Sequence, residues 1–333
     1  MNVFLTGATG FIGNALANRL VAAGHAVSAL VRPGSDDSRL DAHVKRLTGC
    51  LDDVTFLASV LRNADAVCHL AGTTKAFSAR GFRLVNENLT KGLVEATRQF
   101  GQQRQVFLHV SSQAAAGPCE TPPGLCEADR PAPVSQYGLS KLLGERAALS
   151  LAADGRRVAV IRPPMVYGPG DLAFLPLYRL MNLGWLSIPG PAIQPFSIIH
   201  VDDLVAGMEL VLDALVDDRA TGGVYHLAGP KPSCWSDYAE AFSAALRRPV
   251  RPLRVALPLL GLAAWANTLL NVLGLPTSHL TPDKHREARQ EGWLLDDTKA
   301  RREFGYAPRM DIPMGARDAI GWCQAMGLLG GQP

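Results

Sequence analysis

The sequence predicts an α/β fold in which a parallel β-sheet is covered by helices on both of its faces. Short apolar runs that are typical of buried strands occur at 3–5, 26–31, 44–48, 66–70, 105–110 and 157–161. Helical patterns fill the gaps between them, notably at 53–61, 82–100 and 138–152. This alternation indicates a doubly wound parallel sheet. Because the 333 residues are 47% apolar and only 19% charged, a sizeable core can form.

The pattern changes after Arg162, where four prolines interrupt it within 163–176. A strand and a helix return near 195–204, another strand is predicted at 224–228, and the remainder reads as mostly helical. We therefore predict two parts with a substrate cleft between them. The larger part comprises 1–167 together with 195–229, and the smaller, mostly helical substrate-binding lobe comprises 168–194 and 230–333.

Three glycines lie between the first predicted strand and the helix that follows it. Gly7, Gly10 and Gly13 stand three residues apart in T-G-A-T-G-F-I-G. Gly7 can make the tight turn, Gly10 lets a pyrophosphate approach the backbone, and Gly13 lets the helix pack close to the sheet. The helix N-terminus then offers free N–H groups to the phosphate. The spacing differs from G-x-G-x-x-G, so an ordinary glycine turn stays an alternative.

The residue after the second predicted strand bears on the choice of cofactor. An acidic residue near this position would bind the ribose hydroxyls of NAD, but Arg32 stands here. A guanidinium suits a 2′-phosphate and can stack on adenine, so this position favours NADP over NAD. The alternative is a solvated surface arginine.

Tyr137 and Lys141 stand four residues apart in Y-G-L-S-K, at the start of a helical pattern. Four residues are just over one helical turn, so both side chains share a face. A nearby ammonium favours the phenolate and lowers the pKa of a tyrosine, which would allow proton exchange with an alcohol oxygen near neutral pH. Taken alone, this spacing is also typical of ordinary surface pairs.

Two serines follow the strand predicted at 105–110. Ser111 and Ser112 stand in H-V-S-S-Q, at the carboxyl end of the sheet, which is where ligands bind in open α/β folds. A hydroxyl there could hydrogen-bond a carbonyl oxygen and stabilise developing charge. The proline-rich stretch 117–134 that comes next predicts a long functional loop on the same side.

Other classes of protein are disfavoured. There is no G-x-S-x-G elbow of a serine hydrolase, and the eight histidines do not cluster with acids or cysteines at metal-ligand spacing. A net charge of +3 does not suggest nucleic-acid binding. The six scattered cysteines form no C-x-x-C pair and no signal peptide is visible, so we expect reduced thiols in a cytoplasmic protein.

Motifs that match one known family run along nearly the whole chain. They are T-G-A-T-G-F-I-G (6–13), C-H-L-A-G (68–72), Asn86 with T-K-G-L-V-E-A, V-S-S-Q-A-A-A-G (110–117), Y-G-L-S-K (137–141), I-R-P-P-M-V-Y-G-P-G (161–170), H-V-D-D-L (200–204) and F-G-Y-A-P-R near the C-terminus. Together they resemble the extended short-chain dehydrogenases/reductases of the NAD-dependent epimerase/dehydratase superfamily. The resemblance implies a Rossmann-type domain that binds NAD(P).

The resemblance also implies roles for single residues. Tyr137 would be the proton donor or acceptor, Lys141 would lower its pKa and hold the nicotinamide ribose, and Ser112 would orient the substrate oxygen. Ser112 is preferred to Ser111 because it lies five residues before Gly117. Cofactor contacts are implied for Gly7, Thr9, Gly10, Phe11, Ile12, Gly13, Arg32, Leu51, Asp52, Leu70, Ala71, Gly72, Asn86, Val110, Ser111, Tyr137, Lys141, Pro164 and Val166. The chain departs from the family at Gly49-Cys50, where an aspartate often contacts adenine.

The substrate is predicted from composition and from the resemblance. Sugar-nucleotide members often carry R-D-F before V-D-D, whereas P-F-S (195–197) stands here, and the second lobe looks apolar. The segments 255–273 and 284–293 are similar to those of 3β-hydroxysteroid dehydrogenase-like and dihydroflavonol reductase-like members. We predict hydride transfer between NADP(H) and a hydrophobic hydroxy/keto compound, such as a sterol, a β-keto acid or a polyketide-like product. The alternatives are a nucleotide-sugar epimerase or dehydratase with tightly bound NAD, and a non-catalytic dinucleotide-binding protein.

One apolar segment in the smaller lobe has several interpretations. The nineteen residues of 255–273 carry no charge, but a proline, a glycine and three polar residues interrupt them. The first interpretation is a buried or cleft-lining helix. The second is a helix that rests on a membrane surface or admits a lipid-like substrate, and the third is a membrane span. The resemblance is also compatible with a homodimer.

Overall fold

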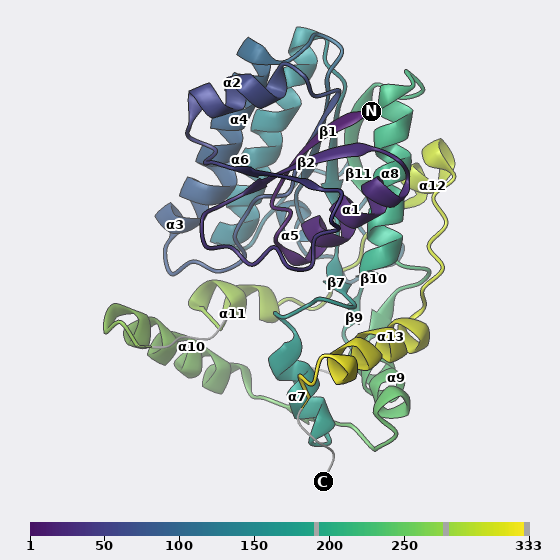
Figure 1. The fold of residues 1–333 in the computed structure, drawn as a ribbon. Helices are drawn as coiled ribbons and strands as arrows, with labels where there is room; N and C mark the ends of the chain where they lie inside the picture. Colours follow the sequence, from purple (N-terminus) through teal and green to yellow (C-terminus); the bar gives the residue numbers. More distant parts are fainter. Residues whose placement is uncertain (190–192, 276–279, 330–333) are drawn as a thin grey trace.

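The main feature of the computed structural model, which describes residues 1–189, 193–275 and 280–329, is a seven-stranded β-sheet (Figure 1). The order of the strands is β11-β6-β5-β4-β1-β2-β3, and each neighbouring pair is parallel. The strands are β1 (Asn2–Thr6), β2 (Ala26–Val31), β3 (Lys45–Thr48), β4 (Ala66–His69), β5 (Val106–Val110), β6 (Val158–Arg162) and β11 (Gly222–His226). The order reverses between β1 and β4, so a ligand crevice is expected at the carboxyl ends of these two strands.

Helices cover both faces of the sheet. One face carries α1 (Phe11–Ala22) and α8 (Val201–Val216), and the other carries α2 (Val54–Leu61), α4 (Leu89–Phe100) and α6 (Gln136–Leu149) (Figure 1). Side chains of β1 alternate between the two faces, because Val3 and Leu5 pack into the core with α1 and α8, whereas Phe4 joins the core with α2 and α4. The predicted doubly wound, Rossmann-type sheet is confirmed.

A second hydrophobic core lies below the sheet in the view of Figure 1. It is enclosed by α7 (Leu175–Asn182), α9 (Trp235–Leu246) and α13 (Ile312–Ala325). Three short strand pairs accompany it: β7 (Met165–Tyr167) with β10 (Ile198–His200), β8 (Trp185–Ile188) with β13 (Arg251–Arg254), and β9 (Pro195–Phe196) with β12 (Ser233–Cys234). Two helices, α10 (Leu257–Val272) and α11 (Pro282–Ala288), lie side by side at the edge, and α12 (Thr298–Phe304) packs near α8.

Some predicted elements differ in detail from the observed ones. The helix predicted at 82–100 is α3 (Ala79–Arg83) and α4, which are joined by the π-helix η1 (Leu84–Asn88). The strand predicted at 224–228 lies at 222–226. The helix predicted at 138–152 begins two residues earlier, at Gln136, because Ser135 caps it. It is followed by a 3₁₀ turn, η2 (Ser150–Asp154).

Of the three interpretations of 255–273, that of a buried helix is wrong. The segment does form a helix, α10, but only Ala264 and Asn267 of that helix are buried. The apolar composition alone predicted burial, but the fold provides a partner, α11, for one side of the helix only. Among the described residues, no helix is long and apolar enough to cross a membrane.

The proline-rich stretch 117–134 forms the predicted loop. It is held by a segment near the C-terminus. Cys119 N–H donates to the Gly292 carbonyl at 3.0 Å, and Leu125 N–H donates to the Leu294 carbonyl at 3.1 Å. Because Trp293 also pairs with β9, this segment ties the loop to the second core.

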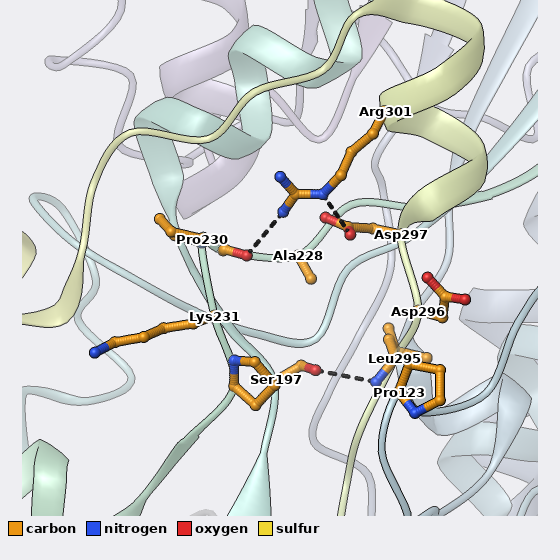
Figure 2. Close-up of a pocket in the computed structure, with 11 residues that line it drawn as sticks. Pro123, Ser197, Ala228, Pro230, Lys231, Leu295, Asp296, Asp297 and Arg301 are labelled. Carbon is orange, nitrogen blue, oxygen red and sulfur yellow. Dashed lines mark hydrogen bonds and ion pairs between the residues drawn. The ribbon is translucent and has the colours of Figure 1, made fainter.

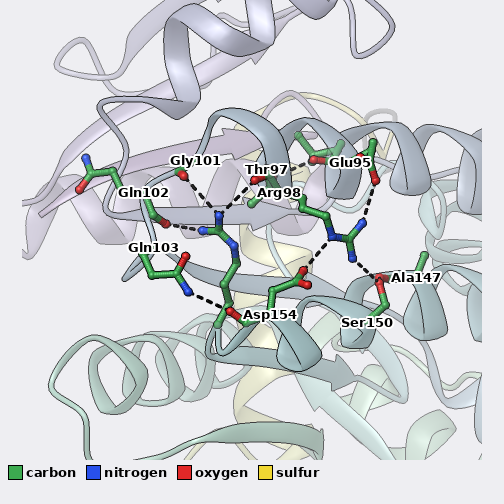
Figure 3. Close-up of polar contacts among 11 residues, drawn as sticks. Glu95, Thr97, Arg98, Gly101, Gln102, Gln103, Ala147, Ser150 and Asp154 are labelled. Atoms are coloured by element: carbon green, nitrogen blue, oxygen red, sulfur yellow. Dashed lines mark hydrogen bonds and ion pairs between the residues drawn. The ribbon is translucent and has the colours of Figure 1, made fainter.

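Polar contacts fix the ends of α4 and α6 (Figure 3). The Arg98 guanidinium lies between Glu95 and Asp154, with nitrogen–oxygen distances of 2.7 and 2.8 Å, and also donates to Ser150 (Figure 3). Arg156 donates to the carbonyls of Gly101 and Gln102, just past the end of α4. Arg156 thus satisfies carbonyl groups at the C-terminal end of α4, and the positive charge of Arg98 suits the negative ends of the two helix dipoles, so the cluster stabilises the fold.

We expect the substitution Gly13→Ala to lower the free energy of unfolding by about 2 kcal/mol. A Cβ at this position would lie 2.1 Å from the Gly7 carbonyl oxygen, so α1 would have to move away from the turn. Gly321→Ala is the matched control, because no atom lies within 4 Å of its Cβ position in α13, and this change should stabilise the helix by about 0.5–1 kcal/mol. Urea denaturation measures both values, and equal values for the two variants would contradict the prediction.

Candidate active site

The glycine turn brings the ends of β1 and β4 together with the start of α1. Gly7 has φ +78°, and a Cβ there would lie 2.6 Å from the backbone nitrogen of Ala71. A Cβ at Gly13 would lie 2.1 Å from the Gly7 carbonyl oxygen, so both positions exclude a side chain. Gly10 is exposed, and the only atom near its Cβ position is the Gly7 oxygen at 3.2 Å. The turn therefore leaves its backbone open at Gly10, as a phosphate-binding turn requires.

Tyr137 lies in the first turn of α6, and the start of this helix is held from a distant part of the chain. The Asp283 carboxylate accepts hydrogen bonds from the backbone N–H groups of Gln136 at 2.7 Å and Tyr137 at 2.9 Å. The Ser135 hydroxyl accepts the next one, from Gly138. Three N–H groups that the helix cannot satisfy internally are thus paired, and a negative charge faces the positive end of the helix dipole.

Lys141 follows Tyr137 by four residues and is buried against the end of β5. Its ammonium donates to the Val110 carbonyl at 2.7 Å. A Cβ at Gly72 would lie 3.6 Å from this ammonium, so the end of β4 also approaches it. Burial lowers the pKa of Lys141 to about 8, although the nearby Glu145 carboxylate acts in the opposite direction.

Asn86 fixes the loop that follows β4. Its side-chain oxygen accepts a hydrogen bond from Thr73 N–H at 2.8 Å, and its amide donates to the Thr73 carbonyl and to the Ser140 hydroxyl, each at 3.0 Å. Asn86 is fully buried within the π-helix η1. Irregular turns of this kind are frequent at functional sites, and this one connects the loop to α6.

The two serines after β5 have different surroundings. Ser111 donates to Glu145 at 2.5 Å, and Glu145 forms a buried ion pair with Arg162 at 2.7 Å. Ser112 instead caps the short helix α5 (Gln113–Ala116). Its hydroxyl also forms a hydrogen bond with the Tyr137 hydroxyl, which lowers the pKa of the phenol. The geometry therefore favours Ser112 over Ser111 as the serine that works with the tyrosine.

The protonation of Tyr137 depends on two opposing effects. Burial raises the pKa of its phenol above the usual value, and the strongest opposing influence is the positive charge of Lys284. The Lys284 ammonium lies 4.7 Å from the centre of the Tyr137 ring. Lys141 was expected to lower the pKa of Tyr137, but in this structure its ammonium donates a hydrogen bond to the Val110 carbonyl at the end of β5.

A cavity of about 580 Å³ opens beside these residues. Ser112 and Tyr137 lie in its wall, together with side chains from the glycine turn, from the segment after β6 and from the second core. Most of the lining is apolar, and it includes Phe11, Ile12, Ala114, Pro163, Pro164, Met165, Val166, Ala173, Phe174, Pro189, Phe196, Trp235, Ala288 and Trp293. A volume and a lining of this kind suit a small or medium-sized apolar molecule.

A smaller cavity of about 280 Å³ shares Ser197 with the larger one (Figure 2). Figure 2 shows Arg301 beside Asp297, and the two form an ion pair at 2.7 Å, while Arg301 also donates to the Gly229 carbonyl. None of the predicted catalytic residues lines it. The larger cavity is therefore the candidate active site.

The predicted site residues fall into three groups. Phe11, Ile12, Ser111, Ser112, Tyr137, Pro164 and Val166 line the larger cavity. A second set, of Gly7, Thr9, Gly10, Gly13, Leu70, Ala71, Gly72, Asn86, Val110 and Lys141, lies in the glycine turn, after β4 and around the end of β5. The third set consists of Arg32, Leu51 and Asp52. Arg32 follows β2 and is exposed, while Leu51 and Asp52 lie in the turn before α2, where Leu51 is buried and Asp52 is exposed.

Several residues of the site were not found from the sequence. Asp283, Lys284 and Glu287 come from α11, whose start T-P-D-K has the pattern of a helix cap but gives no sign of its contact with α6. Asp171 also lines the cavity. Burial raises its pKa to about 6, and one of its oxygens has no hydrogen-bond partner among the described residues.

Comparison with known proteins assigns the chain to a family. The model of the NAD dependent epimerase/dehydratase family matches residues 3–228. The chain belongs to this family. It is thus an NAD(P)-dependent oxidoreductase of the extended short-chain dehydrogenase/reductase type, which confirms the resemblance and the predicted class of enzyme.

The proteins to which this chain is similar carry names that indicate different substrates. Ceramide reductase of Caulobacter vibrioides is 32% identical over 247 residues, which cover 69% of this chain and 71% of that protein. The 2-alkyl-3-oxoalkanoate reductase of Stenotrophomonas maltophilia is 25% identical over 95% of this chain and 98% of its own length. The solved structure of MoeE5 in complex with UDP-glucuronic acid and NAD has a TM-score of 0.77 at 24% identity, and covers 98% of this chain and 100% of that one. That likeness shows a shared fold.

We expect Asp283→Ala to lower the free energy of unfolding by about 2 kcal/mol, because two backbone N–H groups lose a charged acceptor. Asp53→Ala is the control, since Asp53 caps α2 through a single bond at an exposed site and should cost only about 1 kcal/mol. Urea denaturation of both variants measures the difference. An effect at Asp283 no larger than that at Asp53 would contradict the assigned role.

Proposed function

We propose that this enzyme transfers hydride between NADP(H) and a hydrophobic hydroxy/keto compound, such as a sterol, a β-keto acid or a polyketide-like product. The observation that carries the proposal is the apolar lining of the cavity beside Ser112 and Tyr137. A reacting carbonyl would have its oxygen at these two hydroxyls, while its apolar remainder would contact aromatic and proline side chains. Two reductases among the relatives support a keto substrate.

The residues present fit a dinucleotide. The turn at Gly7, Gly10 and Gly13 leaves open backbone at the start of α1, which suits a pyrophosphate. Arg32, exposed at the end of β2, would meet the 2′-phosphate of NADP, and Lys141 would hold the nicotinamide ribose. When bound, the nicotinamide supplies or takes up the hydride.

Side chains of the protein transfer the proton and stabilise the charge that develops on the substrate oxygen. In reduction, the Tyr137 hydroxyl gives its proton to the substrate oxygen, and in oxidation the phenolate takes it back. The Ser112 hydroxyl donates a hydrogen bond to the same oxygen. The positive charge of Lys284 stabilises the phenolate, and thereby offsets part of the effect of burial.

We also propose that the two predicted parts divide these tasks. The part made of 1–167 and 195–229 would bind the cofactor, and the lobe made of 168–194 and 230–333 would bind the substrate. Phe174, Trp235 and Trp293 extend from that lobe into the cavity. The Asp171 oxygen that finds no partner within the described part of the chain would accept a hydrogen bond from a donor group on the substrate.

The second candidate is a nucleotide-sugar epimerase or dehydratase. It is favoured by the fold shared with a UDP-glucuronic acid complex. A diphosphate would need several cations, but Lys284 is the one basic residue among the described residues that line the cavity, and it is paired with Glu287 at 2.7 Å. The lining therefore favours an apolar substrate.

We expect the enzyme to consume NADPH with apolar ketones, in a panel of sterol ketones, β-keto acids, aryl ketones and nucleotide 4-keto sugars. Loss of NADPH absorbance measures the rate. Tyr137→Phe should lower kcat by about a thousandfold without weakening NADPH binding, because only the proton is lost. Tyr225→Phe is the control, since Tyr225 lies on the edge strand β11. Full turnover by Tyr137→Phe would contradict the mechanism, and sugar epimerisation without ketone reduction would favour the second candidate.

We expect Arg32→Glu to raise KM for NADPH by about tenfold to a hundredfold and to leave KM for NADH equal or lower. The change replaces a cation that faces the 2′-phosphate with an anion that repels it. Steady-state kinetics with both cofactors measure the preference. Arg219→Glu, at another exposed arginine, should change neither value. An unchanged preference in Arg32→Glu would show that this arginine does not select the cofactor.

A further inference from the structure

Helix α10 buries a polar side chain and exposes apolar ones. Asn267 is 7% exposed and donates to the Leu280 carbonyl at 2.7 Å. The opposite face of the helix consists of large apolar side chains, each at least 60% exposed: Leu259, Leu262, Trp265, Leu269, Val272 and Leu273. A helix that packs on a protein core in water has the opposite arrangement.

The orientation of α10 is fixed by its contact with α11. The His285 ring lies 2.9 Å from the Leu257 carbonyl, and a Cβ at Gly261 would lie 3.2 Å from the same ring. Figure 1 shows α10 at the edge of the molecule, with α11 along one side of it. The exposed apolar face therefore points away from the protein.

The exposed apolar side chains are concentrated in this helix. Eight of the nineteen large apolar side chains that are exposed among the described residues lie between Leu259 and Leu275. Single exposed leucines are common on protein surfaces, but a continuous face of this kind marks a surface that contacts an apolar partner.

The charges in the chain segment that leads into α10 are all positive. Arg247, Arg251 and Arg254 precede α10 and are exposed, and no acidic residue occurs between Glu240 and Asp283. These three arginines form no ion pair with the described residues, and an apolar helical face beside such basic residues matches a bilayer whose headgroups are anionic.

We propose that the outer face of α10, together with these three arginines, docks on a lipid bilayer that contains anionic phospholipids. The helix would lie in the plane of the interface, because its sixteen residues reach only about 24 Å, whereas a span needs about 30 Å. A second copy of the chain fits less well, since it would bring the same arginines to the contact without acidic partners. The proposal goes beyond the hydride transfer and does not rest on it.

Sedimentation with lipid vesicles tests the proposal without substrate or cofactor. We expect binding to mixed phosphatidylcholine/phosphatidylglycerol vesicles, weaker binding to phosphatidylcholine alone, and a loss of the difference at high salt. The double variant Leu262→Glu/Leu269→Glu should reduce partitioning by about tenfold or more, because two charges would enter the apolar layer. Both side chains are exposed, so the variant should keep its fold, which circular dichroism verifies.

The control is Val54→Glu/Met326→Glu, at two side chains that are 58% and 57% exposed on other parts of the surface. It should bind vesicles like the parent protein. Equal binding by the α10 variant and the parent would overturn the proposal, as would no binding of the parent to either vesicle. A lipid-free dimer that the α10 variant splits into monomers would also overturn it and assign the face to a second copy.

Discussion

The carboxylate of Asp283 at the start of α6 is the contact on which the site depends. It accepts hydrogen bonds from the first two N–H groups of the helix, across 146 residues of sequence. Because the carboxylate faces the positive end of the helix dipole, the contact is both a cap and a charge interaction. Tyr137 lies in that first turn and Lys141 lies one turn later, so the position of both follows from this contact.

The short helix α11 has a different partner on each side, which explains how seven residues can matter to the whole site. Asp283 faces α6, Lys284 and Glu287 face the cavity, and His285 faces α10. A shift of α11 would therefore move the cation beside Tyr137 and one wall of the cavity together. The pKa of the phenol and the shape of the cavity are therefore coupled through one element.

The parts that could be predicted from the sequence have local signals. Strands buried on both faces are apolar throughout, and Gly7 and Gly13 are required by contacts within a few residues or at a neighbouring strand end. The approach of α11 to Tyr137 joins distant segments, so no local pattern could reveal it. The exposure of α10 could not be predicted either, because apolar composition shows that a partner is needed and not whether the fold provides one.

The cavity and the outer face of α10 are two regions lined mainly by apolar side chains, and α11 contacts α10 and also contributes to the cavity wall. A substrate that dissolves in a bilayer would thus meet the protein close to the wall of its own binding site. The cavity is not entirely apolar, because one oxygen of Asp171 has no hydrogen-bond partner among the described residues and is costly to bury unpaired. Under the proposed function, an apolar lining with one such oxygen would suit an amphiphile that has an extended apolar part and a polar group that donates a hydrogen bond.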